Sequence, residues 1–409
     1  MKKLNSLVVV MAAATAMNGL AAIELVSPKK GEVVPVLTDS QRAFVDLPQA
    51  EKRAKFADKD YRRTQMGLPA EVVGGITRKA CWPKTTKLEW KAKDGVSVYD
   101  VKVVGRNGDL AYDQCVTGTS VVIDNLMVAT DYDWTVSAGG EKGASTFRTE
   151  DVPLRLCRWP SIDNVRDIGG VKGLDGKRVK QGMIYRSRRF NEKTHKTYYT
   201  ADELREKGLT NLITKSGKVM TNKREAVKSR ALGEPFGTPE ERAYIVSRFG
   251  LKTDLDIRAG EELYGLVEAP LGNGVKLVKM QFGAYKGAVG DYGKIWFKRI
   301  FKFLQDESVY PVDFHCSACQ DRTGSLAFLL EALLGVDDDH LADDWAYTGF
   351  YNRGPGFCHA KFYDALPREL KKRYPAPTTL ESVEAFAKDA GITQEEIANF
   401  RRLMLEDAR

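Results

Sequence analysis

The chain of 409 residues has little histidine, little cysteine and no long apolar run beyond its first residues. Its 4 His and 6 Cys do not stand at the spacing of a zinc site, so we expect no metal. No later stretch reaches the roughly 18 apolar residues that a membrane helix needs, so we expect no stable membrane span. No segment combines aromatic and basic residues as nucleic-acid readers do, so the net charge of +8 favours small anionic or phosphorylated ligands and no nucleic acid.

The first 22 residues have the composition of a secretory signal peptide. Met1-Lys-Lys supplies positive charge, an apolar stretch runs from Leu7 to Ala16, and small residues continue to Ala22. The apolar stretch is too short for a good span, and no cysteine follows it closely to carry a lipid anchor. We therefore expect export to a periplasm or beyond, with cleavage near Ala16 or Ala22.

The length predicts a multi-domain protein. Residues 23–67 form a polar lead-in or linker with short helices, and residues 68–150 carry short alternating strands separated by turn residues such as Asp94-Gly95. This spacing predicts an all-β sandwich, and its Leu-x-Trp and Tyr-x-Val strands resemble fibronectin type III modules. We expect Trp90 and Trp134 to fill its core, and the sandwich is a candidate surface for a protein partner.

Strands and helices alternate over residues 151–409, which predicts an α/β domain with a mostly parallel sheet flanked by helices. Within it, residues 191–248 are rich in Lys and Arg and are interrupted by Gly and Pro. We interpret them as an inserted lobe. Two interpretations stay open: the lobe covers a pocket and sets substrate choice, or it is a solvated insertion.

The stretch from Val312 to Gly324 carries the candidate chemistry. A strand-like segment leads to His315-Cys316, and Arg322 follows Cys316 after five intervening residues, at the start of an apolar helical run. Loop amides and a helix N-terminus attract an anion, and the same field lowers the pKa of a thiol. An arginine can bind two phosphoryl oxygens at once. The pattern predicts a Cys316 thiolate facing a phosphate held by Arg322.

This Cys-x5-Arg pattern resembles the cysteine-dependent phosphatases. Its flanks, His315 and Asp-Arg-Thr-Gly324, narrow the resemblance to the bacterial atypical tyrosine phosphatases. Two upstream motifs of that family occur in the same order, namely Asn164-Val-Arg-Asp-Ile-Gly-Gly170 with Tyr185-Arg-Ser187, and Leu251–Arg258 followed by Glu261-Glu262. The resemblance implies a cysteine-phosphatase domain that needs no cofactor and hydrolyses phosphomonoesters through a phosphocysteine.

The resemblance also implies residue roles. Cys316 is the expected nucleophile and Arg322 the phosphate clamp, in a phosphate-binding loop formed with Ser317, Ala318, Cys319, Gln320, Thr323 and Gly324. His315, Arg258, Asn164, Arg166 and Asp167 are expected to support the loop. Asp321 is the first candidate for the general acid, although it is equally suited to capping the helix that follows. Asp256 and Asp291 are its rivals, and Asp256 is equally suited to a buried pair with Arg258.

Two loop positions depart from the family pattern, because Cys319 stands where the family has Gly and Gln320 where it has Lys. The missing lysine argues against a lipid phosphate, so we expect a phosphotyrosine protein or a small phosphoester as substrate. Cys316-Ser-Ala-Cys319 also suits a thiol–disulfide redox protein, which is one alternative function, and a catalytically weak phosphate-binding module is another. Cys319 is in addition a candidate resolving thiol for Cys316. The remaining cysteines allow disulfides Cys81–Cys115 and Cys157–Cys358.

Overall fold

The computed structural model describes residues 23–58, 81–351 and 364–407. The expected signal peptide and Cys358 lie outside these residues. The chain divides into two compact units. The first comprises Met1–Glu32, Lys87–Val122 and Asp131–Phe147, and the second comprises Val33–Thr86, Ile123–Thr130 and Arg148–Arg409.

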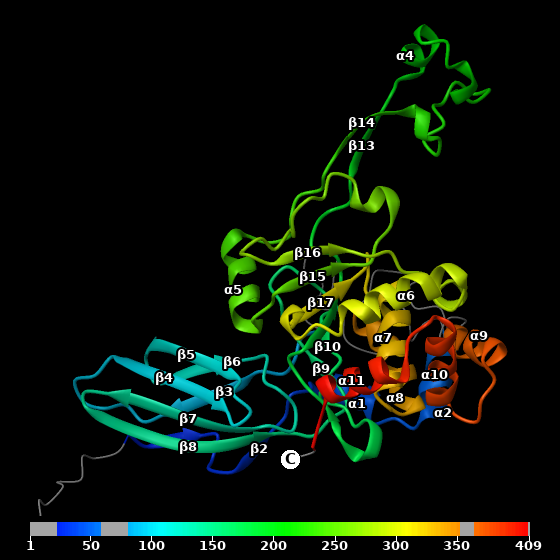
Figure 1. Ribbon diagram of the computed structural model, residues 1–409. Helices are drawn as coiled ribbons and strands as arrows, with labels where there is room; N and C mark the ends of the chain where they lie inside the picture. Colours follow the sequence, from blue (N-terminus) through cyan, green and yellow to red (C-terminus); the bar gives the residue numbers. More distant parts are fainter. Residues whose placement is uncertain (1–22, 59–80, 352–363, 408–409) are drawn as a thin grey trace, which may run out of the picture. The chain divides into compact units, whose positions relative to one another are not determined.

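The β-rich region contains two sheets (Figure 1), in the orders β1-β3-β6 and β2-β8-β7-β4-β5. Trp90 of β3 and Tyr99 of β4 bring their ring centroids within 5.4 Å, and Trp134 of β7 is fully buried. The expected β-rich region is thus confirmed, whereas its likeness to fibronectin type III stays a prediction. The strands are β1 (Leu25–Ser27), β2 (Glu32–Val34), β3 (Thr86–Trp90), β4 (Val98–Gly105), β5 (Leu110–Thr117), β6 (Ser120–Ile123), β7 (Asp131–Ala138) and β8 (Glu141–Thr149).

The C-terminal α/β region is built on a six-stranded sheet in the order β16-β15-β17-β12-β10-β9. β17 lies between β15 and β12 and is parallel to both, and β16 is parallel to β15. β10 is antiparallel to β12 and to β9, so the sheet is mixed, with its parallel part around β17. The strands are β9 (Arg155–Leu156), β10 (Arg166–Asp167), β12 (Ile184–Ser187), β15 (Thr253–Asp256), β16 (Lys276–Lys279) and β17 (Val312–His315).

Both faces of this sheet bury apolar side chains, as the alternation of strand residues requires. Ile184 of β12 joins a large core with α6 and α7, whereas its neighbour Tyr185 joins a second core with α5 on the other face. The helices of this region are α5 (Pro239–Phe249), α6 (Asp291–Phe303), α7 (Arg322–Leu333), α8 (Asp338–Ala346), α9 (Ala365–Arg373), α10 (Thr379–Asp389) and α11 (Gln394–Met404).

Capping residues fix where several of these helices begin. Thr238, Thr378 and Thr393 each form a capping box with the glutamate three residues later, and Asp337 caps α8. None of the helices that the structure describes is both long and apolar enough to cross a bilayer. A short pair formed by β11 (Arg178–Val179) and β18 (Leu405–Glu406) ties the chain after α11 to the start of the domain.

The expected lead-in of residues 23–67 contributes β1 and β2 to the β-rich region. The two short helices that follow, α1 (Asp39–Val45) and α2 (Gln49–Ala57), pack on the α/β region. The ring of Phe44 lies 6.2 Å from that of Tyr347, and the Lys52 ammonium forms a buried ion pair of 2.6 Å with Asp343 of α8. The two short helices therefore form part of the second compact unit.

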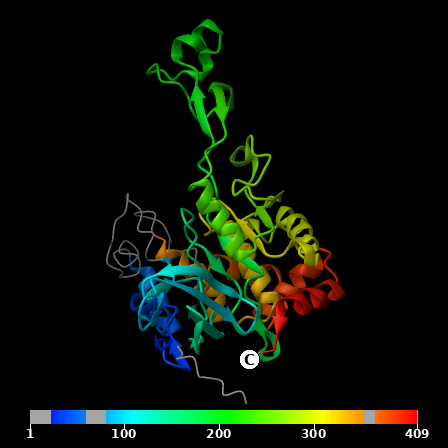
Figure 2. The same ribbon diagram turned by 90° about the vertical axis from the view of Figure 1, so that its left-hand side faces the viewer.

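The inserted segment forms a small lobe on a β-hairpin (Figures 1 and 2). Its strands β13 (His195–Tyr198) and β14 (Val227–Ala231) are antiparallel, and α4 (Ala201–Glu206) follows the first strand. Its own core is small and consists of Leu204, Leu212 and Ala226. So little apolar surface is buried in the lobe that its core alone does not fix its position. The paired strands β13 and β14 connect it to the sheet domain.

Candidate active site

The motif with the candidate chemistry lies where β17 ends and α7 begins, in the middle of the six-stranded sheet. The strand register places His315 opposite Asp256 of β15 and opposite Ser187 of β12. The C-terminal ends of three parallel strands therefore meet at one level, which is where sheets of this kind bind ligands.

Cys316 follows β17 directly and is only 3% exposed. Burial by itself would raise the pKa of this thiol, but the Arg322 guanidinium, the Thr323 hydroxyl and the amides of Ala318 and Thr323 lower it below its ordinary value. The Thr323 hydroxyl is buried beside this thiol and is one of the groups that lower its pKa. These contacts favour the thiolate form of Cys316.

The loop after Cys316 turns through a left-handed residue. Cys319 has a φ of +63°, a conformation that glycine adopts freely and other residues adopt at a cost. Arg186 holds this residue, because its Nε lies 3.3 Å from the Cys319 sulfur and its Nη2 donates to the Cys319 carbonyl at 2.5 Å. The loop therefore keeps a shape suited to glycine with a cysteine in its place.

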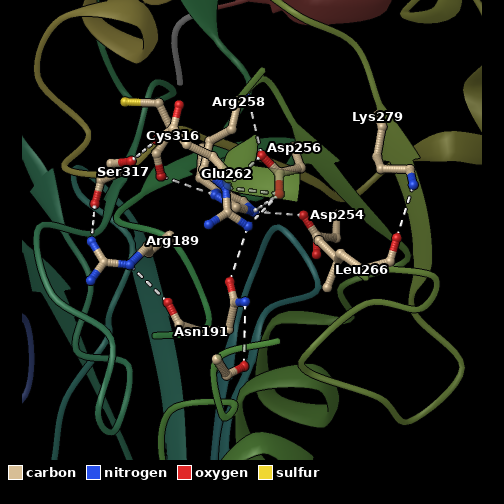
Figure 3. A network of polar contacts seen from close by, with 12 residues as sticks. Arg189, Asn191, Asp254, Asp256, Arg258, Glu262, Leu266, Lys279, Cys316 and Ser317 are labelled. Atoms are coloured by element: carbon tan, nitrogen blue, oxygen red, sulfur yellow. Dashed lines mark hydrogen bonds and ion pairs between the residues drawn. The ribbon is translucent and has the colours of Figure 1, made fainter. Parts of the chain in front are cut away.

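Arg322 forms a two-pronged ion pair with Glu262 of η5 (Gly260–Leu263). Its Nη1 lies 2.6 Å from Oε2 and its Nη2 lies 3.1 Å from Oε1. The hydroxyl of Ser317 donates to the same carboxylate, and Figure 3 shows Glu262 beside Ser317. Burial would raise the pKa of Glu262, but these two partners lower it to about 2. One carboxylate thus joins both ends of the loop and fixes the orientation of the guanidinium.

A buried charged network lies behind the loop. His315 places Nε2 2.9 Å from Asp254 and Nδ1 3.2 Å from the Cys316 carbonyl oxygen. Burial would lower the pKa of His315, but Asp256 and Asp254 outweigh it and raise the pKa to about 9, so the ring is a cation at neutral pH. Asp256 itself accepts three hydrogen bonds from the Arg258 guanidinium, one at 2.6 Å from Nη2 and two at 2.9 and 3.0 Å from Nε.

The Asn-x-Arg-Asp motif supports the loop from another side. Asn164, in a left-handed conformation with φ +56°, donates to the Ala318 carbonyl at 2.9 Å. Arg166 donates to the Asn164 side chain at 2.5 Å and lies 3.0 Å from Asp344 of α8. Arg186 pairs with the same Asp344. Two arginines from neighbouring strands therefore share one buried carboxylate below the loop.

Asp167, the last residue of this motif, stabilises the start of the sheet. Its carboxylate accepts from the amides of Gly169 at 2.8 Å and Gly182 at 2.6 Å and pairs with Arg155. These contacts tie β10 to the chain entering β12. The residue therefore supports the loop only through the strands.

Comparison with known proteins agrees with this geometry. A sequence model described as the tyrosine phosphatase family matches residues 157–406. The chain belongs to the tyrosine phosphatase family. No curated protein matches the chain. Among solved structures, the core catalytic domain of the PP-IP phosphatase SIW14 from S. cerevisiae, in complex with citrate, is similar at 16% identity and a TM-score of 0.24, over 35% of this chain and 87% of that one. The family match alone carries the assignment.

The protein is thus a tyrosine-phosphatase-like hydrolase of phosphoesters, which confirms the predicted enzyme class.

Such hydrolysis needs an acid that protonates the leaving oxygen. Asp321 occupies the N-cap position of α7 but makes no capping hydrogen bond with its side chain; the Tyr285 hydroxyl donates to it instead. Trp345 in turn donates to the Tyr285 oxygen at 3.3 Å. Asp291 begins α6, is 94% exposed and pairs with Lys294.

The start of α7 packs closely in this phosphatase. Gln320 is 3% exposed, and its carbonyl accepts from the Gly324 amide at 3.1 Å. A Cβ atom on Gly324 would lie 3.1 Å from the Trp345 ring, so glycine lets the helix approach this ring. The Gly-to-Cys and Lys-to-Gln departures thus fall on buried loop positions.

Sequence reasoning missed several residues that complete the phosphatase site. Glu262 stands within the motif that follows Arg258, but the spacing does not tell which of the two adjacent glutamates reaches the loop. Tyr285 (η6, Tyr285–Gly287) and Asp344 carried no motif at all. Their roles appear only when η6 and α8 are folded against the loop.

Of the two disulfides that the sequence allows, Cys81–Cys115 has both cysteines in the described residues, and it is not formed. Cys115 is an exposed free thiol, so it is not joined to Cys81, and Cys157 is a buried free thiol whose pKa burial raises to about 12. Cys316 and Cys319 are also free thiols. No group of three metal-ligating side chains is found in the residues that the structure describes.

Proposed function

We propose that the protein is an exported phosphatase that hydrolyses phosphomonoesters through a phosphocysteine at Cys316. One observation carries this proposal: Cys316 and Arg322 meet at a single strand-to-helix junction, and the Arg322 guanidinium lowers the pKa of the thiol despite its burial. The same guanidinium that favours the thiolate is placed for the phosphate that the thiolate attacks.

In the first step the Cys316 thiolate attacks phosphorus in line with the leaving oxygen. The sulfur–phosphorus bond forms as the phosphorus–oxygen ester bond breaks. Arg322 and the loop amides stabilise the charge on the three other oxygens. Asp321, in its protonated form, gives its proton to the leaving oxygen while the Tyr285 hydroxyl holds its other side.

In the second step a water molecule takes the place of the leaving group. The Asp321 carboxylate removes a proton from this water as its oxygen attacks phosphorus. The sulfur–phosphorus bond breaks, and the Cys316 thiolate and inorganic phosphate are released. The Thr323 hydroxyl stabilises the departing thiolate, since it contributes to lowering the pKa of that thiol.

The substrate that we propose is a phosphotyrosine protein or a small phosphoester. Gln320 is uncharged and buried where relatives of the bacterial atypical subgroup carry lysine. The loop thus lacks the second cation of that subgroup, which favours these esters over a lipid phosphate.

Turnover of p-nitrophenyl phosphate by the reduced protein tests the proposal. Cys316→Ser is expected to reduce kcat by about 10³-fold or more, because the nucleophile is lost. The matched control is Cys115→Ser, which changes an exposed thiol and should leave turnover intact. Absence of turnover by the parent protein would favour the phosphate-binding module. Reduction of insulin disulfides in place of ester hydrolysis would favour the thiol–disulfide alternative.

The general acid is tested by the pH dependence of kcat. Asp321→Asn is expected to lose one limb of the profile and about 10²- to 10⁴-fold in rate. Asp291→Asn is the matched control, because Asp291 is exposed and paired with Lys294. Asp256→Asn tests the remaining candidate. A complete profile for Asp321→Asn would assign the acid elsewhere.

Export and a partner-binding role for the β-rich region belong to the same proposal. The charged start and short apolar stretch of residues 1–22 support a cleaved signal peptide. N-terminal sequencing of the protein from periplasmic and cytoplasmic fractions tests export, and folded protein that keeps Met1 contradicts it.

The two sheets around Trp90 and Trp134 support a fibronectin type III-like module that binds a protein partner.

A further inference from the structure

A cavity lies beside the phosphate-binding loop, between the loop and the base of the inserted lobe. It has a volume of about 290 Å³ and is lined by side chains that include Arg189, Lys193, Lys196, Glu261, Glu262 and Ser317. Ser317 and Glu262 belong to the loop and its ion pair, whereas Lys193 and Lys196 come from the lobe. The cavity therefore adjoins the place where the scissile phosphate binds.

The wall shared with the loop is rigid and cationic. Arg189 is only 4% exposed, and it donates to the Ser317 carbonyl at 3.2 Å and to the Asn191 carbonyl at 2.8 Å (Figure 3). A buried guanidinium tied to the loop backbone keeps its position when a ligand enters. Because Ser317 directly follows Cys316, the Arg189 guanidinium brings positive charge close to the loop. Arg189 itself takes no part in the proposed catalytic steps.

The opposite wall carries two lysines with different partners. Lys196 pairs with Glu261, which also lies 2.9 Å from Arg230 and 3.6 Å from Arg224. Lys193 is exposed at the cavity and makes no ion pair with any residue that the structure describes. Arg189 lies 3.5 Å from the half-exposed carboxylate of Glu192. Because Glu261 is shared among three cations and Glu262 is used by the loop, the cavity still keeps an excess of positive charge.

The size of the cavity indicates what this charge can bind. A volume near 300 Å³ is at the lower end for small-molecule sites, so it holds a phosphate group with the carbon that bears it. It is too small for a folded peptide segment. Arg189, Lys193 and Lys196 supply the charge-assisted hydrogen bonds that a phosphate accepts.

We propose that this cavity is a second anion subsite, and that the enzyme acts preferentially on small soluble esters with two phosphates on neighbouring carbons. One phosphate enters the Cys316 loop, and the second is held by Lys193, Lys196 and Arg189. This inference rests on the proposed phosphatase function for the first phosphate. It makes the inserted lobe a determinant of substrate choice through the two lysines at its base.

The test compares 2,3-bisphosphoglycerate with 3-phosphoglycerate and p-nitrophenyl phosphate. In the parent enzyme kcat/KM is expected to be highest for the bisphosphate. Replacing both lysines, as Lys193→Gln with Lys196→Gln, is expected to lower kcat/KM for the bisphosphate about tenfold and to leave p-nitrophenyl phosphate within about twofold. Lys215→Gln is the matched control, because it removes one charge from an exposed lobe residue outside the cavity.

Binding to the Cys316→Ser protein separates failure of the subsite from failure of the enzyme. Calorimetry is expected to show tighter binding of 2,3-bisphosphoglycerate than of 3-phosphoglycerate, and the lysine pair variant should remove the difference. Equal binding of the two ligands, or an equal effect of Lys215→Gln, overturns the subsite whether or not the parent is active. Lysine-dependent binding of a doubly phosphorylated peptide without binding of the bisphosphate overturns the assignment to a small ester.

Discussion

The guanidinium of Arg322 donates two hydrogen bonds to the carboxylate of Glu262, from Nη1 at 2.6 Å and from Nη2 at 3.1 Å. The same carboxylate accepts from the Ser317 hydroxyl. Glu262 thus has two effects on the site: it orients the clamp, and its negative charge offsets part of the positive field that Arg322 exerts on Cys316.

Glu262→Gln is expected to change these two effects in opposite directions. The rate kcat should fall about 10- to 100-fold, because a guanidinium displaced by a fraction of an ångström binds the transition state less well. The pKa of Cys316 should fall further, because the offsetting charge is gone. Steady-state kinetics and the pH dependence of iodoacetamide alkylation measure the two effects. Glu268→Gln, an exposed change nearby, should affect neither. A Cys316 pKa that rises would contradict this role.

Tyr285→Phe tests the contact with the proposed acid. Removal of the hydroxyl that donates to Asp321 is expected to lower kcat about tenfold, because the carboxyl loses the contact that orients it towards the leaving oxygen. The rate of Cys316 alkylation should be unchanged. Tyr292→Phe, at an exposed tyrosine, is the control. An unchanged kcat would show that Tyr285 does not act on the acid.

Substitutions at Cys319 test the left-handed loop position. Cys319→Gly relieves the strain of φ +63° but loses the contact with Arg186, so the free energy of unfolding should stay within about 1 kcal/mol of the parent. Cys319→Val places a branched side chain in the same conformation and should destabilise by about 2 kcal/mol or more. Urea denaturation measures both. Equal stability of the two variants would mean that the backbone conformation is not the constraint.

His315 predicts a pH dependence of stability. Its pKa is raised to about 9, so the stabilisation from its charged form is complete below its ordinary value of 6.5 and is lost as the pH rises towards 9. The loss is at most about 3.5 kcal/mol, since one pKa unit is worth about 1.4 kcal/mol. The Cys316→Ser protein is the suitable background, because the thiolate contributes with the opposite sign. Adding His315→Asn should remove the decline, and a decline that persists would assign it to other groups.

Mild oxidation tests the resolving role of Cys319. Burial raises its pKa to about 11, so few Cys319 thiols are ionised at neutral pH and attack on an oxidised Cys316 should be slow. Mass spectrometry after brief peroxide treatment is expected to show oxygen added to Cys316. A rapid loss of two hydrogens through a Cys316–Cys319 bridge would support the redox switch instead.

Much of the fold was predictable, because its signals are local. The β-rich region, the strands around Asp256 and Cys316, and the threonine caps follow from alternation and from side chains that act within four residues. The antiparallel pairing of β10 with β12 was not predictable, because it depends on the contacts of the buried Asp167 and not on any strand pattern. The sheet is therefore mixed where a mostly parallel one was expected.

The sequence by itself determined which residues we propose as the nucleophile and as the group that binds the phosphate. Cys316 and Arg322 are separated by five residues on one strand–loop–helix unit, whose backbone geometry brings them together wherever it occurs. Only the tertiary structure decided what surrounds them: Glu262 is 60 residues from Arg322, Tyr285 is 36 from Asp321, and Arg186 is 133 from Cys319. Such contacts depend on how whole elements pack, and no local spacing records that packing.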